Sequence, residues 1–295
     1  MKYGLPYKGS KNKIAKQIID ILPPANCFVD VFAGGCAIAH AALLSGKYKR
    51  IIANDIDVKI PMLFKDAIEG KLPANYDRFV SREEFNQLKD SDAIVACCWS
   101  FGNDKCTYLW GKDIAKTKEL AFKMVKCGDE KLRYCYYRQF IKSLGNDIFD
   151  LQNLHILERL QRLERLQSLE SLQSLERLES LGRLDAKIDI EVFGFDFKNL
   201  DIPENALVYC DPPYDDTEGY GGVDFNSAEF WEWARDTSKR HLLAVSEYKA
   251  PDDFVTILER AKTCSFSATN NAKKTTEKLF VHESQKSKWN NEFLF

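Results

Sequence analysis

The chain has 295 residues, of which 45% are hydrophobic and 29% charged, enough for one large α/β domain and a smaller lobe. Its formal net charge of −2 excludes a global basic field, so any contact with nucleic acid would have to be local. The nine cysteines show no Cys-x-x-Cys spacing, which argues against a disulfide framework and a zinc site, so we expect no metal. Met1-Lys2-Tyr3-Gly4 does not begin a signal peptide, and no apolar run is long enough to span a bilayer. We therefore expect no membrane partner and a cytoplasmic protein with reduced thiols.

The N-terminal segment combines a small-residue turn with a lysine at the start of a helix. Tyr7-Lys8-Gly9-Ser10-Lys11 precedes apolar positions 14, 18, 19, 21 and 22, which predict a helix that ends at Pro23-Pro24. Such a turn can receive an anion, although a solvated lysine is the simpler interpretation.

A strand, a glycine turn and a second helix follow. Residues 27–32 predict a buried strand, Ala33-Gly34-Gly35 a turn, and residues 37–44 an apolar helix. Together they form the first unit of a Rossmann-like sheet, in which glycine lets the backbone approach a ligand closely. The turn is not Gly-x-Gly-x-x-Gly, so a dinucleotide site loses its main support.

A second predicted strand, residues 50–54, ends at an acid. Asp55 lies 25 residues after Asp30, which ends the first strand. An acid at the tip of the second strand accepts hydrogen bonds from ribose hydroxyls, whereas the plainer interpretation is an Asn-Asp turn.

Residues 65–150 are helical and polar in pattern. They contain candidate helices at 78–88 and 116–126 and an apolar run at 94–101. Between residues 105 and 142, lysines and arginines alternate with tyrosines and a tryptophan. This mixture suits phosphate contacts and insertion between bases, and it equally suits an ordinary solvated helical face.

Residues 151–185 form a low-complexity insert with leucine at every third position from Leu151 to Leu184. Its composition favours helix, but at about 100° per residue the leucine stripe slips back by about 60° at each step. The insert must therefore be wrapped by other elements, pair with another copy of the chain, or leave the α-helix. We predict a partner or spacer element without a catalytic role, with self-association through 151–184 as one option.

The most informative stretch is residues 206–214, where an apolar run ends in Asp211-Pro212-Pro213-Tyr214. The run predicts a buried central strand, and prolines cannot donate to a ladder, so they lie just past its carboxyl end. Ligands of open α/β sheets bind at that edge. The Asp211 carboxylate and the Pro212 carbonyl become rigid acceptors beside the flat Tyr214 ring, which suits an exocyclic amino group on a planar base.

The other predicted elements complete the sheet. Residues 191–197 predict a strand leading to Asp196, which is either a turn acid or an acceptor for an adenine amino group. The glycine-rich stretch 215–226 suits a loop that closes over substrate. Further on we expect helices at 228–239 and 252–261 and strands at 241–246, 264–268 and 278–281.

Asp-Pro-Pro-Tyr after a buried strand resembles the amino-methyltransferases, whose matching loop holds the target nitrogen. Taken with the N-terminal motifs, the chain resembles the Dam-like branch of the DNA adenine-N6 methyltransferases. Two positions depart from the family pattern: Ser10 replaces the second glycine of the first turn, and Cys36 replaces the last glycine of the Phe-x-Gly-x-Gly motif.

The resemblance implies a Rossmann-like α/β sheet that depends on S-adenosylmethionine, formed by residues 1–64 and 186–295. It also implies an inserted helical DNA-recognition lobe at 65–150, with the leucine insert at 151–185 kept apart. The expected activity is methyl transfer to N6 of an adenine flipped out of duplex DNA, in a bacterial cell or a phage-infected host.

The resemblance also assigns site residues. Those expected at the target nitrogen are Asp211, Pro212 and Tyr214. Those expected to bind S-adenosylmethionine are Tyr7, Lys11, Phe32, Gly34, Asp55 and Asp211. The alternatives are transfer to cytosine N4, to adenine in RNA or to a protein glutamine, and a DNA-binding or interaction protein that has lost catalysis.

Overall fold

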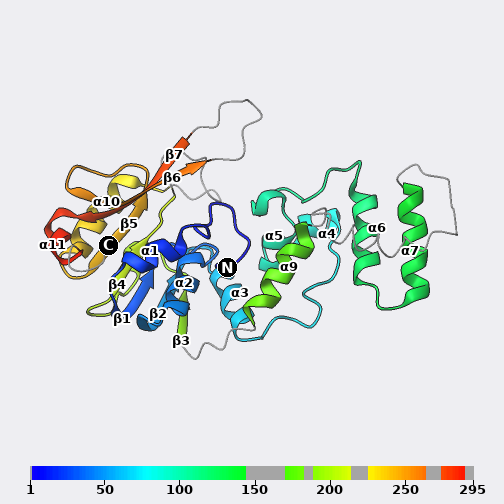
Figure 1. The fold of residues 1–295 in the computed structure, drawn as a ribbon, viewed down its shortest axis with the longest axis horizontal. Coiled ribbons are helices and arrows are strands. Elements are labelled where there is room, and N and C mark those ends of the chain that lie inside the picture. Colours follow the sequence, from blue (N-terminus) through cyan, green and yellow to red (C-terminus); the bar gives the residue numbers. More distant parts are fainter. Residues whose placement is uncertain (1, 144–169, 183–188, 214–224, 264–273, 290–295) are drawn as a thin grey trace. The chain divides into compact units, whose positions relative to one another are not determined.

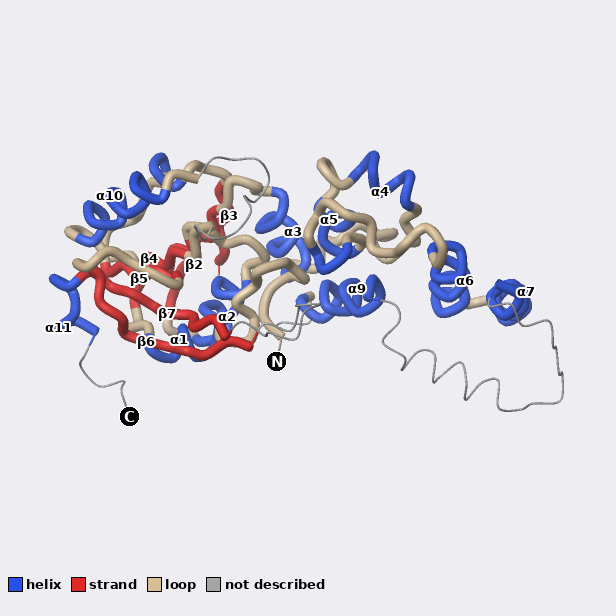
Figure 2. The backbone as a smooth tube through the Cα atoms, turned by 90° about the horizontal axis from the view of Figure 1, so that it is seen from above, coloured by secondary structure: helices blue, strands red, loops and turns tan. Residues whose placement is uncertain are grey.

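The computed structural model describes residues 2–143, 170–182, 189–213, 225–263 and 274–289 (Figure 1). The chain divides into two compact units. The first, here called the sheet unit, comprises residues 1–4, 10–65 and 185–295, and the second, the helical unit, comprises residues 5–9 and 66–184. All named strands belong to the sheet unit, and the named elements of the helical unit are helices (Figure 2).

The sheet unit contains seven strands in the order β3-β2-β1-β4-β5-β7-β6. The strands are β1 (Ala25–Asp30), β2 (Tyr48–Asn54), β3 (Asp189–Phe193), β4 (Leu207–Cys210), β5 (Leu242–Glu247), β6 (Phe254–Thr263) and β7 (Lys274–His282). The first five in spatial order pair in parallel, while β7 runs antiparallel to both β5 and β6. This doubly wound order confirms the Rossmann-like α/β class predicted from the sequence.

Helices or 3₁₀ turns separate the strands along the chain from β1 to β5, whereas β5, β6 and β7 follow one another directly. The helices are α1 (Ala15–Ile21), α2 (Ala37–Ser45), α3 (Lys59–Ile68), α10 (Ser227–Ser238) and α11 (Lys286–Trp289), with 3₁₀ turns η2 (Phe197–Asn199) and η3 (Glu283–Gln285). Central strand β4 is buried at all four positions, as its uninterrupted apolar run predicts. Its Val208 packs with Val29 of β1 and Val245 of β5 in one continuous core.

Residues 252–261, predicted as a helix, instead form most of β6, so that prediction was wrong. Phe254, Leu258 and Ala261 have helical spacing, but pairing with β7 from Phe254↔His282 to Thr263↔Lys274 stabilises the strand instead. A bulge between Thr256 and Leu258 shifts the alternation of inward and outward side chains along β6, so the sequence does not show the period-two pattern of a regular strand. The predicted strand 264–268 lies outside the described residues, and 278–281 lies within β7.

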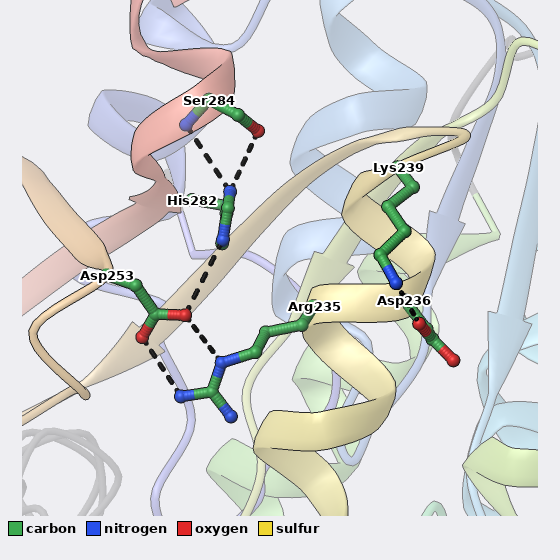
Figure 3. Close-up of polar contacts among 6 residues, drawn as sticks. All are labelled: Arg235, Asp236, Lys239, Asp253, His282 and Ser284. Carbon is green, nitrogen blue, oxygen red and sulfur yellow. Dashed lines mark hydrogen bonds and ion pairs between the residues drawn. The ribbon is translucent and has the colours of Figure 1, made fainter.

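A polar network ties the open end of the β6–β7 hairpin, where β6 begins and β7 ends, to α10 (Figure 3). Arg235 donates from Nε and Nη2 to the Asp253 carboxylate, the second bond at 2.9 Å. His282 Nε2 lies 3.5 Å from the same carboxylate, and His282 Nδ1 lies 2.8 Å from Ser284 Oγ. Hydrogen bonds from Arg235 hold the pKa of Asp253 below its usual value. The network therefore fixes where β7 lies against the sheet.

The helical unit is built around aromatic rings. Its helices are α4 (Arg82–Leu88), η1 (Phe101–Asn103), α5 (Ala93–Cys98), α6 (Ala115–Lys126), α7 (Glu130–Ser143) and α9 (Glu170–Leu181), and α3 ends within it. Ser81 caps α4 by accepting from Glu84 N, and Asp92 caps α5 in the same way. Trp99 lies at the centre, with ring centroids 5.2 to 5.6 Å from Phe79, Trp110 and Phe122.

The described end of the leucine insert is the regular helix α9. Leu175, Leu178 and Leu181 are buried together with Ser171 and Ser174, a spacing that makes one ordinary helix face. Helix α9 packs against α5 in the same unit. Over so short a helix the three-residue leucine period has not yet slipped off that face, so other elements can cover it. Residues 151–169 of the insert lie outside the described residues.

Candidate active site

The carboxyl ends of β1, β2 and β4 meet at one edge of the sheet, and backbone hydrogen bonds join them. Val31 N, just after β1, donates to Tyr209 O of β4 at 3.0 Å, and Ala33 N donates to Asn54 O of β2 at 2.8 Å. The buried Asn54 side chain donates to Val31 O at 3.0 Å and to Phe195 O at 2.9 Å. The edge is therefore held rigidly by main-chain contacts.

The glycine bend between β1 and α2 has left-handed backbone at two positions, one on either side of Gly35. Gly34 has φ +46° and Cys36 has φ +56°. Left-handed backbone costs a residue with a Cβ roughly 1–2 kcal/mol, which is the reason that the family pattern has glycine where this chain has Cys36. The bend nevertheless keeps its shape, because Cys36 N donates to Ala33 O at 2.7 Å and the cysteine side chain is buried.

Asp55 binds the glycine bend directly. Its Oδ2 accepts from Gly34 N at 2.8 Å, and its Oδ1 accepts from Asp57 N at 2.9 Å. The structure therefore brings Asp55 and Gly34 together, as expected for two residues of one ligand site.

Asp30 adds a buried acid at the end of β1. Its Oδ2 accepts from Ala39 N of α2 at 3.2 Å, and its Oδ1 is buried without a hydrogen-bond donor among the residues that the structure describes. Burial raises the pKa of Asp30 well above its usual value, and the nearby charges of Asp211 and Asp55 raise it further. Such a group favours a hydrogen-bonding or cationic partner at this edge.

A buried ammonium binds the Asp-Pro-Pro corner. Lys11 Nζ lies 2.8 Å from Asp211 Oδ1 and 3.3 Å from Glu277 Oε2. The exposed fractions of these side chains are 5% for Lys11, 19% for Asp211 and 4% for Glu277. Burial by itself lowers the pKa of Lys11, but the two carboxylates reverse this and raise it above its usual value. Lys11 is therefore a fixed cation beside Asp211.

The remaining predicted site residues have different surroundings. Pro212 is buried directly after Asp211, and Tyr214 lies outside the described residues. Phe32 is partly buried and packs against the core, with ring centroids 5.6 Å from Phe197 and 5.7 Å from Phe230, so its ring supports the bend. Asp196 caps η2 by accepting from Lys198 N at 2.9 Å, as expected of a turn acid.

Tyr7 is the predicted residue that the structure does not group with the others, because it belongs to the helical unit. Lys105 Nζ lies 5.1 Å from the Tyr7 ring centroid and 3.3 Å from its hydroxyl. Lys8 N also donates to Asn103 O at 3.3 Å. Tyr7 is thus held on the turn that follows α5, only four positions before Lys11.

Three residues of this edge were missed by reasoning from the sequence: Asp30, Asn54 and Glu277. For Glu277 a signal was present, because it shares an inward face of β7 with Leu279 and Val281, both fully buried. An acid in such an alternation is unusual enough to mark a functional position. The wrong helix at 252–261 obscured it, since the register of β7 depends on that neighbour.

Comparison with models of protein families relates part of this chain to a known family. Residues 7–150 match the model of the D12 class N6 adenine-specific DNA methyltransferases. The matched segment is just under half of the chain and resembles that family. The adenine-specific DNA methyltransferase activity and the Dam-like resemblance expected from the sequence are thereby confirmed. The match includes the glycine bend and much of the helical unit of the methyltransferase, and it ends before Asp211.

The other comparisons add less. A crystal structure described as a "putative methylase" from Haemophilus influenzae matches with 12% identity and a TM-score of 0.30, covering 94% of this chain and 91% of that one. No curated protein matches the methyltransferase. Among the described residues, no helix has the length and apolar character needed to cross a bilayer. The same residues contain no cluster of three or more His, Cys, Asp or Glu able to hold a metal ion.

Proposed function

We propose that this methyltransferase moves a methyl group from S-adenosylmethionine to N6 of an adenine flipped out of duplex DNA. The observation that carries the proposal is the joining of the glycine bend to the Asp-Pro-Pro corner: Val31 N donates to Tyr209 O, two residues before Asp211. A methyl donor held at the bend and an amino group held at the corner would then be neighbours.

The residues of the edge fit S-adenosylmethionine. Gly34 and Asp55 form a bend-and-acid pair of the kind that receives a nucleoside, and the buried Asp30 Oδ1 favours a cationic or donor group nearby. Ile56 is 56% exposed after β2, and Phe195 is 47% exposed after β3, which leaves apolar surface for an adenine ring. When bound, the sulfonium supplies an electrophilic methyl group and leaves as a neutral thioether.

The chain itself supplies position and charge. An adenine inside the stack cannot reach the bend, so it must be flipped out. The Asp211 carboxylate and the Pro212 carbonyl would accept hydrogen bonds from the N6 amino group and turn the nitrogen lone pair toward the methyl group. Tyr214 would stack on the flipped base. Fixing both groups in one geometry supplies most of the rate, because it replaces a bimolecular encounter.

We assign DNA contact to the helical unit. On α7, Lys131, Tyr134, Arg138 and Lys142 are exposed, and their spacing places them along one stripe of the helix. Cations and an aromatic ring in a stripe suit phosphate contacts. The unit thus offers the local basic surface that a net charge of −2 requires.

The proposal is tested by label transfer. Purified protein is incubated with S-adenosylmethionine carrying a tritiated methyl group and, separately, unmethylated duplex DNA, RNA or protein. We expect label in N6-methyladenine from DNA, and none above background with Asp211→Ala. Label in N4-methylcytosine, RNA or glutamine would assign the activity to an alternative substrate. Counts equal to those of Asp211→Ala with every substrate would favour a binding protein without catalysis.

A further inference from the structure

The charge balance of the buried edge differs from that of a simple ion pair. One ammonium, Lys11, faces two carboxylates, Asp211 and Glu277, at 2.8 and 3.3 Å. All three side chains are less than one-fifth exposed, so solvent screens them weakly. With each group in its usual ionic form, the three side chains carry one excess negative charge.

That excess has a use at this position. If Lys11 faced Asp211 alone, the ammonium would neutralise the charge of this carboxylate. Asp211 would then be a weaker hydrogen-bond acceptor for an amino group. An ammonium has three donors, and Glu277 draws on them in competition with Asp211. A methyl group arriving on an amino nitrogen brings positive charge, which a partly uncompensated carboxylate stabilises in a site with low dielectric.

The packing of β7 does not explain why an acid occupies position 277. Its neighbours on the inward face of β7, Leu279 and Val281, are fully buried and apolar. A buried charge is costly, and well-packed apolar residues usually replace buried ion pairs without loss of stability. The hairpin that carries Glu277 is moreover held in place by the Arg235–Asp253 pair at its other end.

We infer that Glu277 is a positioning residue for the proposed methyl transfer, holding the Lys11 ammonium between two carboxylates so that Asp211 keeps negative charge for the target amino group. This inference rests on the proposed function. Among the described residues, other titratable groups that interact electrostatically with Asp211 are Asp30 at the end of β1 and Tyr209 and Cys210 on β4.

The first test measures the charge sharing without catalysis. The protein is labelled with ¹⁵N-lysine, the Lys11 Nζ signal is assigned with Lys11→Arg, and its pKa is followed by NMR. Glu277→Gln should lower the pKa of Lys11, because one of the two carboxylates that raise it is gone. The matched control is Glu259→Gln, which removes an exposed acid from the same hairpin and should leave that pKa unchanged. An unchanged pKa in Glu277→Gln would overturn the inference.

The second test measures catalysis. Glu277→Gln should lower kcat on DNA about 10-fold, less than the roughly 100-fold loss expected when a direct transition-state contact is removed. The KM for DNA and the calorimetric Kd for S-adenosylmethionine should stay within about twofold, since Glu277 acts on Asp211 through Lys11 and is not proposed to touch either ligand. Glu277→Asp, which keeps the charge, should recover part of kcat. An unchanged kcat, or equal losses in kcat and cofactor binding, would reject the positioning role.

Failure of the proposed function would be seen differently. In that case the wild-type protein would transfer no label to DNA, while the NMR titration would still report whether Glu277 and Asp211 share Lys11. Should Glu277→Gln not fold, Glu277→Asp carries both measurements, with a smaller pKa shift and a smaller loss of kcat expected. Wild-type values for Glu277→Asp in both measurements would then contradict the inference.

Discussion

The sheet unit and the helical unit treat charge in opposite ways. In the sheet unit, Lys11, Asp30 and Glu277 are buried at the edge where the parallel strands end. In the described part of the helical unit no charged side chain is buried to that degree, and its ion pairs, such as Lys126–Asp77, lie on the surface. The buried polar residues of that unit are serines.

The contrast indicates that the two units have different functions. Buried charges are costly and are kept where chemistry requires a field that water does not screen. Exposed cations on an apolar scaffold can meet a polyanion without prior desolvation. On the proposed function, the aromatic core around Trp99 supports the DNA-contacting surface, and the Lys11 ammonium shared by two carboxylates supports the methyl transfer. Each of the following experiments changes one side of this comparison.

The largest effect is expected in the aromatic core. Trp99→Ala removes a fully buried ring that contacts three others, which should cost about 3–5 kcal/mol of stability. Hydrogen exchange should accelerate in α5 and α6 and stay unchanged in β1 and β4, if the two units unfold separately. Equal acceleration in the strands would show that one cooperative unit includes both.

The next largest effect is expected at the sheet edge. Asp211→Asn keeps the shape of the side chain but removes the charge that Lys11 faces. We expect kcat to fall roughly 100- to 1,000-fold while the protein stays folded. Asp236→Asn, on an exposed ion pair with Lys239, is the control and should be silent (Figure 3). A kcat within a few-fold of wild type would remove Asp211 from the reacting centre.

A smaller effect is expected on the α7 stripe. The double change Lys131→Ala and Arg138→Ala should weaken DNA binding and reduce the slope of log Kd against log salt by about 0.9 for each cation removed. Binding isotherms at several salt concentrations measure this slope. Lys239→Ala, which removes an exposed cation from the sheet unit, should leave it unchanged. An unaltered slope in the double variant would place the DNA on another surface.

The smallest effect is expected at the Arg235–Asp253 pair. Because Asp253 has a lowered pKa in the folded protein, its contribution to stability is present above its unfolded pKa and is lost as pH falls through the folded value. The pair is partly exposed, so solvent limits this contribution to about 0.2–1 kcal/mol. Urea unfolding of wild type and Arg235→Gln should differ at pH 7 and converge in acid. A difference independent of pH would show that the arginine acts by packing alone.

Local patterns were sufficient for much of the fold. The run at 206–210 is apolar without interruption, and the run at 27–32 is apolar except for Asp30, so both predicted buried strands, which β4 and β1 confirm. The glycine bend was predicted from its glycines, since few other residues tolerate its backbone conformation. The β6–β7 hairpin was not predicted, because a bulge hides its alternation and only pairing decides between strand and helix.

By itself, the sequence determined the resemblance to the Dam-like methyltransferases, the Rossmann-like class and the position of Asp-Pro-Pro at a strand end, because these depend on short contiguous motifs. The tertiary structure alone decided that Lys11 lies between Asp211 and Glu277, residues about 200 and 266 positions further along the chain. It also decided that Tyr7 belongs with Lys105. Such contacts arise from strand order and register, which bring distant residues to one edge and which no local pattern encodes.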